Sequence, residues 1–418
     1  MTVPAIRTTC CIAGGGPAGM MLGLLLARAG VEVLVLEKHG DFLRDFRGDT
    51  LHPSTLDVMA ELGMDERLLA LPHQKVRTLS AGFGDRDYPV ADFSRLKVSH
   101  PYIVLMPQWD FLDFLAAEAS AFAGFSLKMD AEATGLIETD GKVVGLRAET
   151  VDGSVEILAD LVVDASGRKS TLRGAAGLAV EDLGAPIDVF WFRLSCREGE
   201  GTETGGRFEP GKLMVRIFRG DYWQCAYVIP KGAAENVRAR GIEAFRADIS
   251  PMLPGGAAQA AEISSFDDIK LLSVSVDRLT RWHRPGFLSI GDAAHAMSPV
   301  GGVGINLAIQ DAVATANALA VPLKEKRLAE RDLEAVQRRR MLPTRMTQAA
   351  QVFIHDRVLT PVLAEAGRGE GPIRPPLPVR LLARCPLLRG LPARLVGIGI
   401  RPEHVDRPTQ AIVRAGAN

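Results

Sequence analysis

The chain has 418 residues, 24% of them charged, with 49 lysines and arginines against 50 aspartates and glutamates. This length predicts two or three domains around a large hydrophobic core. The balanced charge gives no electrostatic reason to expect nucleic acid as a partner.

The cysteine pattern and the first residues indicate in which cellular compartment the protein is expected. The five cysteines have irregular spacings that match neither a disulfide framework nor a zinc site, so we expect no metal and a reducing environment. The first ten residues are not typical of a signal peptide, and the longest apolar run, residues 20–27, is too short to span a bilayer. We therefore expect a cytoplasmic protein in which Cys10 and Cys11 are small core residues.

The first elements form a β-α-β unit. Residues 8–13 predict a buried strand, residues 17–29 predict a helix that Gly30 ends, and residues 31–36 predict a second strand. Such a unit requires the two strands to be parallel and implies a parallel sheet.

The turn inside this unit, residues 14–19, reads Gly-Gly-Gly-Pro-Ala-Gly and fits G-x-G-x-x-G. Gly14 allows the tight turn, Gly16 lets the backbone approach a pyrophosphate, and Gly19 lets the helix lie close to the strand. The helix N-terminus offers unpaired N–H groups to the phosphates. Glu37 ends the second strand, where its carboxylate can accept hydrogen bonds from ribose hydroxyls. The residues predicted to bind a dinucleotide here are Gly14, Gly16, Pro17, Ala18, Gly19, Glu37 and Lys38.

The next part of the chain predicts a helix followed by strands. The helix lies within residues 102–124, after Pro107. Strands at 134–138 and 143–150 flank an Asp-Gly turn, and residues 155–163 return as a further strand.

Between about residues 181 and 275 the pattern changes to that of an antiparallel sheet. Strands are expected at 189–195, 213–218 and 222–229, and the last two form a hairpin. Aromatic residues on these strands could form the wall of a pocket, although such residues are more often core. They are Trp191, Tyr222, Trp223 and Tyr227.

A second glycine-rich motif follows an apolar strand at residues 287–290 and precedes a helix at about 304–319. Asp292 at the strand end could hold sugar or polyol hydroxyls, and the glycines allow a flat ring to lie against the backbone. The helix N-terminus would face a group that gains negative charge, as reduced flavin does. His295 is interpreted as a side chain that stabilises the turn. The predicted binding residues are Gly291, Asp292, Pro299, Gly301, Gly302, Gly304, Ile305 and Asn306.

Together the two motifs resemble those of the para-hydroxybenzoate hydroxylase-like FAD monooxygenases, over roughly residues 8–320. Arg47 resembles the arginine that follows the second strand and lies near the flavin in that family. Gln108 resembles the glutamine that contacts the flavin side chain at a helix start. The resemblance adds both to the expected FAD ligands and places Arg47, His52 and Pro299 nearest to the reacting atoms.

The resemblance implies both a fold and a reaction. NADPH or NADH would reduce FAD, O2 would add to give a flavin C4a-hydroperoxide, and one oxygen would pass to an aromatic or polyketide-like small molecule. The expected fold is α/β, with a Rossmann-like FAD-binding domain interleaved with an antiparallel-sheet substrate domain and a helical C-terminus. The FAD-binding domain would comprise residues 1–75, 102–180 and 276–320, the substrate domain 76–101 and 181–275, and the C-terminal region 321–418.

Residues 163–173 depart from the family pattern. Gly167, Ser170 and Arg173 fit it, but Ser166 stands where an aspartate is usual and Asp164 where a glycine is frequent. The departure leaves FAD binding intact as an expectation and weakens the inference about the electron donor.

Three alternatives stay open at this point. One is a flavin-dependent halogenase, although residues 223–230 read W-Q-C-A-Y-V-I-P and lack the W-x-W-x-I-P signature. The second is a double-bond reductase on the same fold. The third is a non-enzymatic escort protein, which an intact cofactor site argues against.

The C-terminal segment 371–402 contains six arginines and no acid, among many leucines and prolines. It could lie on a membrane surface, cap the flavin domain or form a dimer contact. Packing within a soluble protein, monomer or homodimer, is the favoured interpretation, with the aromatic substrate and O2 as the expected partners.

Overall fold

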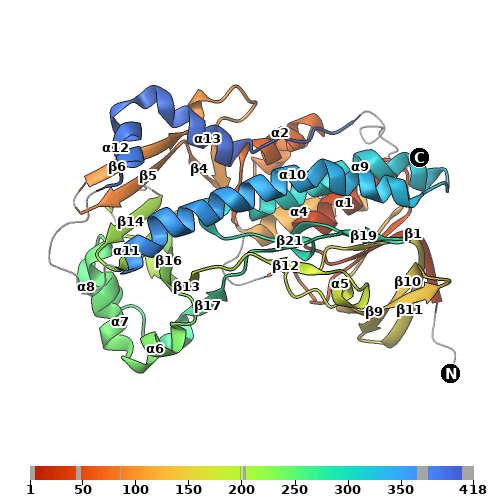
Figure 1. The fold of residues 1–418 in the computed structure, drawn as a ribbon, viewed down its shortest axis with the longest axis horizontal. Helices are drawn as coiled ribbons and strands as arrows, with labels where there is room; N and C mark the ends of the chain where they lie inside the picture. The colour runs from red at the N-terminus through yellow and green to blue at the C-terminus, as the bar shows by residue number, and fades with distance from the viewer. Residues whose placement is uncertain are drawn as a thin grey trace.

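The computed structural model describes residues 5–43, 49–84, 86–197, 199–200, 204–364 and 375–406. Arg47, a predicted flavin and catalytic residue, lies outside these ranges. Two sheets lie at opposite ends of the view in Figure 1, and the long helix α10 (Glu330–Ile354) runs across the molecule between them.

The first sheet is built around parallel strands in the order β20-β11-β1-β2-β8, with β19, β10 and β9 added antiparallel. Burial of β2 and of the last four residues of β1 explains why these two stretches are apolar runs without alternation. The predicted β-α-β unit is confirmed. The strands are β1 (Ala5–Ala13), β2 (Val33–Leu36), β8 (Phe125–Lys128), β9 (Ala131–Thr139), β10 (Lys142–Thr150), β11 (Gly153–Asp164), β19 (His283–Arg284) and β20 (Phe287–Ser289).

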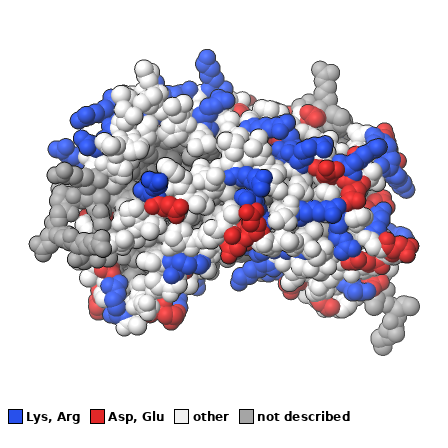
Figure 2. All heavy atoms as spheres, viewed as in Figure 1, with Lys and Arg blue, Asp and Glu red and all other residues white. Residues whose placement is uncertain are grey.

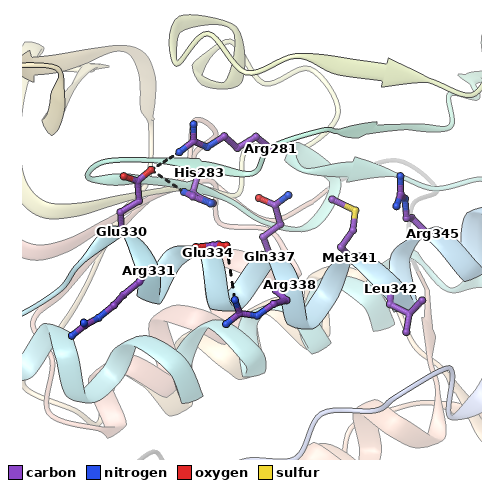
Figure 3. A pocket seen from close by; sticks show the side chains of 10 residues that line it. All are labelled: Arg281, His283, Glu330, Arg331, Glu334, Gln337, Arg338, Met341, Leu342 and Arg345. Atoms are coloured by element: carbon purple, nitrogen blue, oxygen red, sulfur yellow. Dashed lines mark hydrogen bonds and ion pairs between the residues drawn. The ribbon is translucent and has the colours of Figure 1, made fainter.

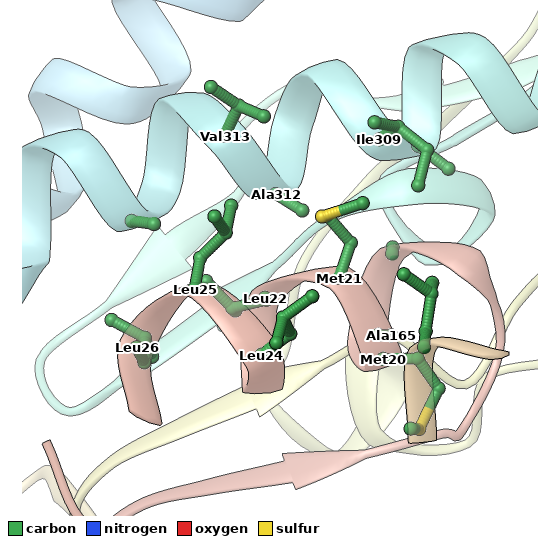
Figure 4. Packing of buried hydrophobic residues seen from close by; sticks show 14 of the residues in the cluster. Met20, Met21, Leu22, Leu24, Leu25, Leu26, Ala165, Ile309, Ala312 and Val313 are labelled. Atoms are coloured by element: carbon green, nitrogen blue, oxygen red, sulfur yellow. The ribbon is translucent and has the colours of Figure 1, made fainter. Parts of the chain in front are cut away.

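Helices α1 (Pro17–Arg28), α4 (Gln108–Ser120) and α9 (Gly304–Lys324) pack together on one face of this sheet. Gly30, with a φ of +82°, follows the end of α1 as predicted. Methionine and leucine side chains of α1 interdigitate with Ile309, Ala312 and Val313 of α9 (Figure 4). Small alanines at every fourth position of α9 let the two helices approach closely. These buried alanines are Ala308, Ala312, Ala316 and Ala320.

The second sheet has the order β17-β13-β16-β15-β14-β5-β6, antiparallel except where β14 lies parallel to β5. Helices α6 (Ala234–Ala239), α7 (Ile242–Ile249) and α8 (Gly256–Ala260), which the sequence pattern did not predict, pack against one face. The strands are β5 (Thr78–Phe83), β6 (Arg86–Asp92), β13 (Ile187–Ser195), β14 (Gly205–Glu209), β15 (Lys212–Phe218), β16 (Tyr222–Pro230) and β17 (Lys270–Ser273).

Short elements connect the two sheets. Strands β3, β7 and β4 form one small sheet, and β12, β18 and β21 form another. We keep the predicted division into interleaved domains as a proposal. The connecting elements are β3 (Thr50–Leu51), α2 (Pro53–Glu61), α3 (Asp65–Leu68), β4 (Gln74–Val76), β7 (Ile103–Leu105), α5 (Leu172–Ala175), β12 (Val180–Asp182), β18 (Asp277–Leu279) and β21 (His295–Ala296).

The C-terminal region is helical, as predicted. Helix α10 continues into a π-helical turn, His355–Leu359, and α11 (Thr360–Ala364). Farther along the chain, helices α12 (Leu377–Arg384) and α13 (Gly390–Gly397) pack on β6 of the second sheet. Among the helices that the structure describes, none is both long and apolar enough to cross a bilayer.

Candidate functional site

The register of the parallel sheet brings the two predicted motifs to one edge. Ala13 lies opposite both Leu36 and Asp164, and Asp164 lies opposite Ser289. The residues that follow these strand ends, including Gly14, therefore emerge side by side. Carboxyl ends of parallel strands are where open α/β sheets bind ligands.

The first glycine loop has the geometry that its three glycines require. Gly14 has a φ of +111°, and a Cβ there would lie 2.4 Å from the carbonyl oxygen of Ala165. A Cβ on Gly19 would lie 1.9 Å from the carbonyl oxygen of Gly14, so only glycine lets α1 sit this close to β1. A Cβ on Gly16 would meet no atom within 4 Å. Open space in front of the N-terminus of α1, where Pro17 is the first helical residue, fits an approaching pyrophosphate.

Glu37 lies beside this loop and is 8% exposed. One carboxylate oxygen accepts the N–H of Gly15 at 3.0 Å, and the other accepts the N–H of His39 at 3.1 Å and its Nδ1 at 2.7 Å. A carboxylate has room for further donors, so Glu37 fits the predicted contact with ribose hydroxyls. Lys38, the other residue predicted here, is exposed.

The second motif contacts the first directly. Gly291 has a φ of +60°, and a Cβ there would lie 3.0 Å from the Cβ of Ala18 and 3.6 Å from that of Ala308. Asp292 accepts a hydrogen bond of 2.9 Å from Nε of Arg168, whose Nη2 also donates to the carbonyl of Met297. The N-terminal ends of α1 and α9 thus adjoin one loop system.

A buried charge network supports the second motif from behind. Asp311 of α9 accepts the N–H of Gly291 at 3.0 Å and Nε2 of His295 at 2.6 Å on one oxygen, and Nε of Arg340 at 2.9 Å on the other. Arg340 also donates to Glu403 at 3.3 Å. Burial alone would raise the pKa of Asp311, but His295 and Arg340 outweigh it and hold the pKa below its usual value. His295 therefore has the structural role that the sequence predicted.

The loop that carries Pro299 is held by polar side chains of α10 and the π-helical turn. Gln351 accepts the N–H of Ser298 at 3.1 Å and donates to the carbonyls of Ser298 and Val300 at 2.9 and 3.0 Å. Nε2 of His355 lies 2.8 Å from Oγ of Ser298. Sequence reasoning missed these supports, together with Asp311 and Arg340, because nothing near them in the chain marks them.

Hydrogen bonds from β3 and α2 hold the glycines before α9 and the first turn of that helix. Thr50 donates to the carbonyl of Gly302 at 2.9 Å, and Thr55 donates to the side chain of Asn306. The remaining predicted ligands fall in the same stretch, with Gly301 at a φ of +81°, Gly304 beginning α9 and Ile305 buried in the core.

His52, predicted near the reacting atoms, is fully buried at the start of α2. Its Nδ1 donates to the carbonyl of Val396 in α13 at 2.8 Å. Burial lowers the pKa of His52 to about 4, against the opposing effect of the Val396 and Gly302 backbone. The side chain is therefore neutral at pH 7 and joins the flavin motif to the C-terminal helices.

This pKa predicts a loss of stability in acid. In the unfolded chain His52 binds a proton below pH 6.5, whereas in the folded chain it stays neutral down to about pH 4. The free energy of unfolding therefore decreases as the pH falls from 6.5 to 4. The full difference between the two pKa values corresponds to about 3 kcal/mol in the free energy of unfolding. We expect urea unfolding of His52→Gln, which keeps a donor for Val396, to depend less on pH between 6.5 and 4.5 than the wild type. Parallel curves for the two proteins would contradict the assignment.

A buried ion pair joins the second sheet to the segment that precedes β3, near Gln108. Asp49 pairs with Arg219 at the β15–β16 turn, and their side chains are 9% and 4% exposed. Arg219 also donates from Nε to Gln224 at 3.0 Å, and the N–H of Gln108 at the start of α4 bonds the Asp49 carboxylate. Burial raises the pKa of Asp49 despite these partners. The β15–β16 turn of the second sheet is therefore anchored beside the N-terminus of α4.

The two faces of β16 have different surroundings. Trp223 and Tyr227 are 2% and 5% exposed and pack in the core below α6–α8, so neither forms the wall of a pocket toward the flavin motifs. The opposite face carries Gln224 and also Ala226, which lies in one apolar cluster with Val300 of the second motif. Trp191 lies opposite Ala226 in the register and shares that face.

The departure at residues 163–173 forms a compact hydrogen-bonded turn. Asp164 is fully buried and accepts Oγ of Ser166 and Oγ of Ser170, each at 2.6 Å. Burial raises the pKa of Asp164. Ser166 thus directs its hydroxyl inward to Asp164 and lies against the Gly14 turn, while Arg173 pairs with Asp277 at 3.3 Å.

An open hollow of about 890 Å³ lies along α10, away from the predicted residues (Figure 3). Several of its charged side chains lie in pairs: Glu330 faces Arg281 and His283, and Glu334 faces Arg338. None of the predicted binding residues lines it, so we do not place the cofactor there.

The site therefore has the features of a flavoprotein: two glycine loops at one sheet edge, helix N-termini directed at them, and a second sheet anchored alongside. This arrangement defines the class of FAD-dependent oxidoreductases. Residues 7–350 match the sequence family described as "FAD binding domain", and the chain belongs to this family.

The chain is similar to individual proteins of known activity, both in sequence and in structure. The 6-methylpretetramide 4-monooxygenase of Streptomyces rimosus is 32% identical over 396 residues, which cover 93% of this chain and 92% of that protein. The p-nitrophenol 4-monooxygenase PnpA of Pseudomonas putida DLL-E4 superposes with a TM-score of 0.74 at 18% identity, covering 99% of this chain and 100% of that one. The myxobacterial chondrochloren halogenase CndH gives 0.68 at 19% identity, covering 80% and 79%. The structural likenesses show the fold alone, whereas the family and the first relative show that the chain is an FAD-dependent monooxygenase.

Proposed function

We propose that this monooxygenase hydroxylates an aromatic, polyketide-like small molecule with NADPH or NADH as the electron donor. The observation that carries the proposal is the likeness to a 6-methylpretetramide 4-monooxygenase along nearly the whole of both chains. The apolar cluster that brings Ala226 of β16 together with Val300 of the second motif, with Trp191 packed against it, would border a flat aromatic substrate.

Each of the two motifs would bind a different part of FAD. The N–H groups at the start of α1 would bind the pyrophosphate, and Glu37 the adenosine ribose. The loop from Gly291 to Asn306 would receive the ring system and its side chain, with Asp292, Pro299 and Gln108 at its border. Bound FAD supplies the two-electron chemistry and the activation of O2.

The rest of the chain would position and shield the reaction. The Asp49–Arg219 pair would hold the β15–β16 turn of the second sheet beside the start of α4, which would help to position the substrate and exclude water. Neutral His52 keeps the Gly302 backbone packed against α13 without introducing a charge near the ring. Arg47, His52 and Pro299 remain the proposed residues nearest to the reacting atoms.

Purified holoenzyme tests the proposal. We expect a flavin absorption spectrum that NADPH or NADH bleaches, faster oxidation of the dinucleotide in the presence of a polycyclic phenol, and a product that carries one atom from ¹⁸O₂. Failure of every phenol in a broad panel to stimulate the oxidation would contradict the substrate class. A product that gains chlorine in the presence of chloride would favour the halogenase instead.

The compartment is also a proposal. All five cysteines are free thiols, and Cys10 and Cys11 are fully buried, as the sequence predicted. Burial raises the pKa of both thiols, so they are unreactive core residues. Free thiols and a nicotinamide donor both suit the cytoplasm.

A further inference from the structure

The segment from residue 375 to 399 presents leucine side chains to solvent. Leu387 is 82% exposed, Leu377 is 76%, Leu391 is 66%, Leu381 is 52% and Leu395 is 45%. Single exposed leucines need no explanation, but a group on one surface usually marks a contact site.

Every charged residue between positions 375 and 402 is an arginine. In Figure 2 the upper left of the molecule, over α12 and α13, shows blue side chains around white atoms and no red ones. The exposed arginines are Arg380, Arg384, Arg394 and Arg401. Together with the five leucines they form what we call the leucine–arginine surface.

This surface is held in place by the fold. Ala393 is fully buried, and Gly397 approaches Phe93 so closely that a Cβ would lie 3.1 Å from its ring. Arg389 donates to the carbonyls of Leu382 and Ala383 at 2.9 and 2.7 Å and so closes the corner between α12 and α13. The leucines therefore project from anchored helices.

The underlying strand does not neutralise the arginines. Asp92 at the end of β6 already pairs with Arg95 at 3.0 Å, and Asp87 lies 3.9 Å from Arg207. Among the residues that the structure describes, no carboxylate forms an ion pair with Arg380, Arg384, Arg394 or Arg401. The surface thus combines exposed apolar groups with positive charge, which is the composition of helices that bind at a lipid interface.

We propose that the leucine–arginine surface docks on an anionic lipid bilayer, with its leucines in the acyl boundary and its arginines at the phosphates. A second copy of the chain fits less well, because a two-fold contact would bring this surface against itself and place arginines opposite arginines. The inference does not depend on the identity of the substrate.

Vesicle flotation of the full-length holoenzyme tests this. We expect it to float with phosphatidylcholine vesicles that contain about a quarter phosphatidylglycerol, and much less with phosphatidylcholine alone or in high salt. The double variant Leu387→Asp/Leu391→Asp should reduce the partition coefficient by about tenfold or more. The control is Val151→Asp, an equally exposed apolar residue (81%) at the far end of the molecule, which should float like the wild type.

A probe on the surface gives an independent readout. Cys385 is exposed, whereas Cys196 is only half-buried and the other thiols are buried, so a polarity-sensitive dye can be attached to Cys385 in a Cys196→Ser background. We expect its emission to shift to the blue with anionic vesicles. Absence of flotation and of a shift at every lipid composition would overturn the proposal. So would a dimer in light scattering that the double variant dissociates.

Discussion

Replacing Gly16 by valine should greatly weaken FAD binding while leaving the apoprotein folded. The Cβ has no protein atom within 4 Å, and the φ of −74° and ψ of −176° suit any residue, so the fold has room for the side chain. The same space is where a pyrophosphate would approach the helix N-terminus. We expect FAD affinity to fall by roughly a hundredfold, measured by fluorescence quenching during reconstitution of the apoprotein.

Two measurements separate this result from misfolding. Valine is a poorer helix N-cap than glycine, so apoprotein stability should fall by only about 1 kcal/mol. Gly135→Val, in β9 with equally open surroundings, should change neither stability nor FAD affinity appreciably. Normal FAD binding by Gly16→Val would show that the coenzyme does not lie against this loop.

The glycine loops and the parallel strands of the β-α-β unit could be predicted because their causes are local. Gly14 and Gly19 are needed where two backbones meet within a few residues, and the alternation of apolar strands and helices gives the parallel sheet. The Asp-Gly turn after β9 is equally local, with Asp140 and Gly141 both at positive φ. Each of these features is determined by residues that lie close together in the sequence.

The supports of the second motif could not be found in this way. Helix α10 buries a polar stripe and exposes Leu342, Met346 and Phe353 at 51%, 46% and 63%, the reverse of the usual amphipathic pattern. A polar stripe normally predicts the solvent-facing side, and only the tertiary fold shows that it binds the loop backbone. The buried stripe consists of Arg340, Thr344, Gln348 and Gln351, and His355 of the π-helical turn continues it.

The helices α6–α8 were missed for a related reason. Their segments are short, and the longest of them, α7, has eight residues. Helices of this length owe their stability to packing, here of Phe245 edge-on against Phe190 and Tyr227. The local sequence is therefore a poor predictor of these three helices.

Replacing Asp311 by asparagine should be among the most destabilising single changes in the chain. All three groups around the carboxylate are donors: the N–H of Gly291, His295 Nε2 and Arg340 Nε. Whichever way the amide turns, its NH2 group faces a donor, and Arg340 keeps only Glu403 of its two buried carboxylate partners. Breaking a buried pair by removing one partner costs about 3–5 kcal/mol, which we expect in the free energy of unfolding by urea.

The same substitution should weaken FAD binding, because Asp311 fixes the backbone of Gly291 where the two motifs meet. The matched control is Glu334→Gln, which removes an exposed carboxylate 3.9 Å from Arg338 on α10 and should cost under about 0.5 kcal/mol. If Asp311→Asn cost no more than this control, the network would be incidental to the fold. If it unfolded easily yet bound FAD normally at low temperature, the Gly291 loop would be positioned by its glycines alone.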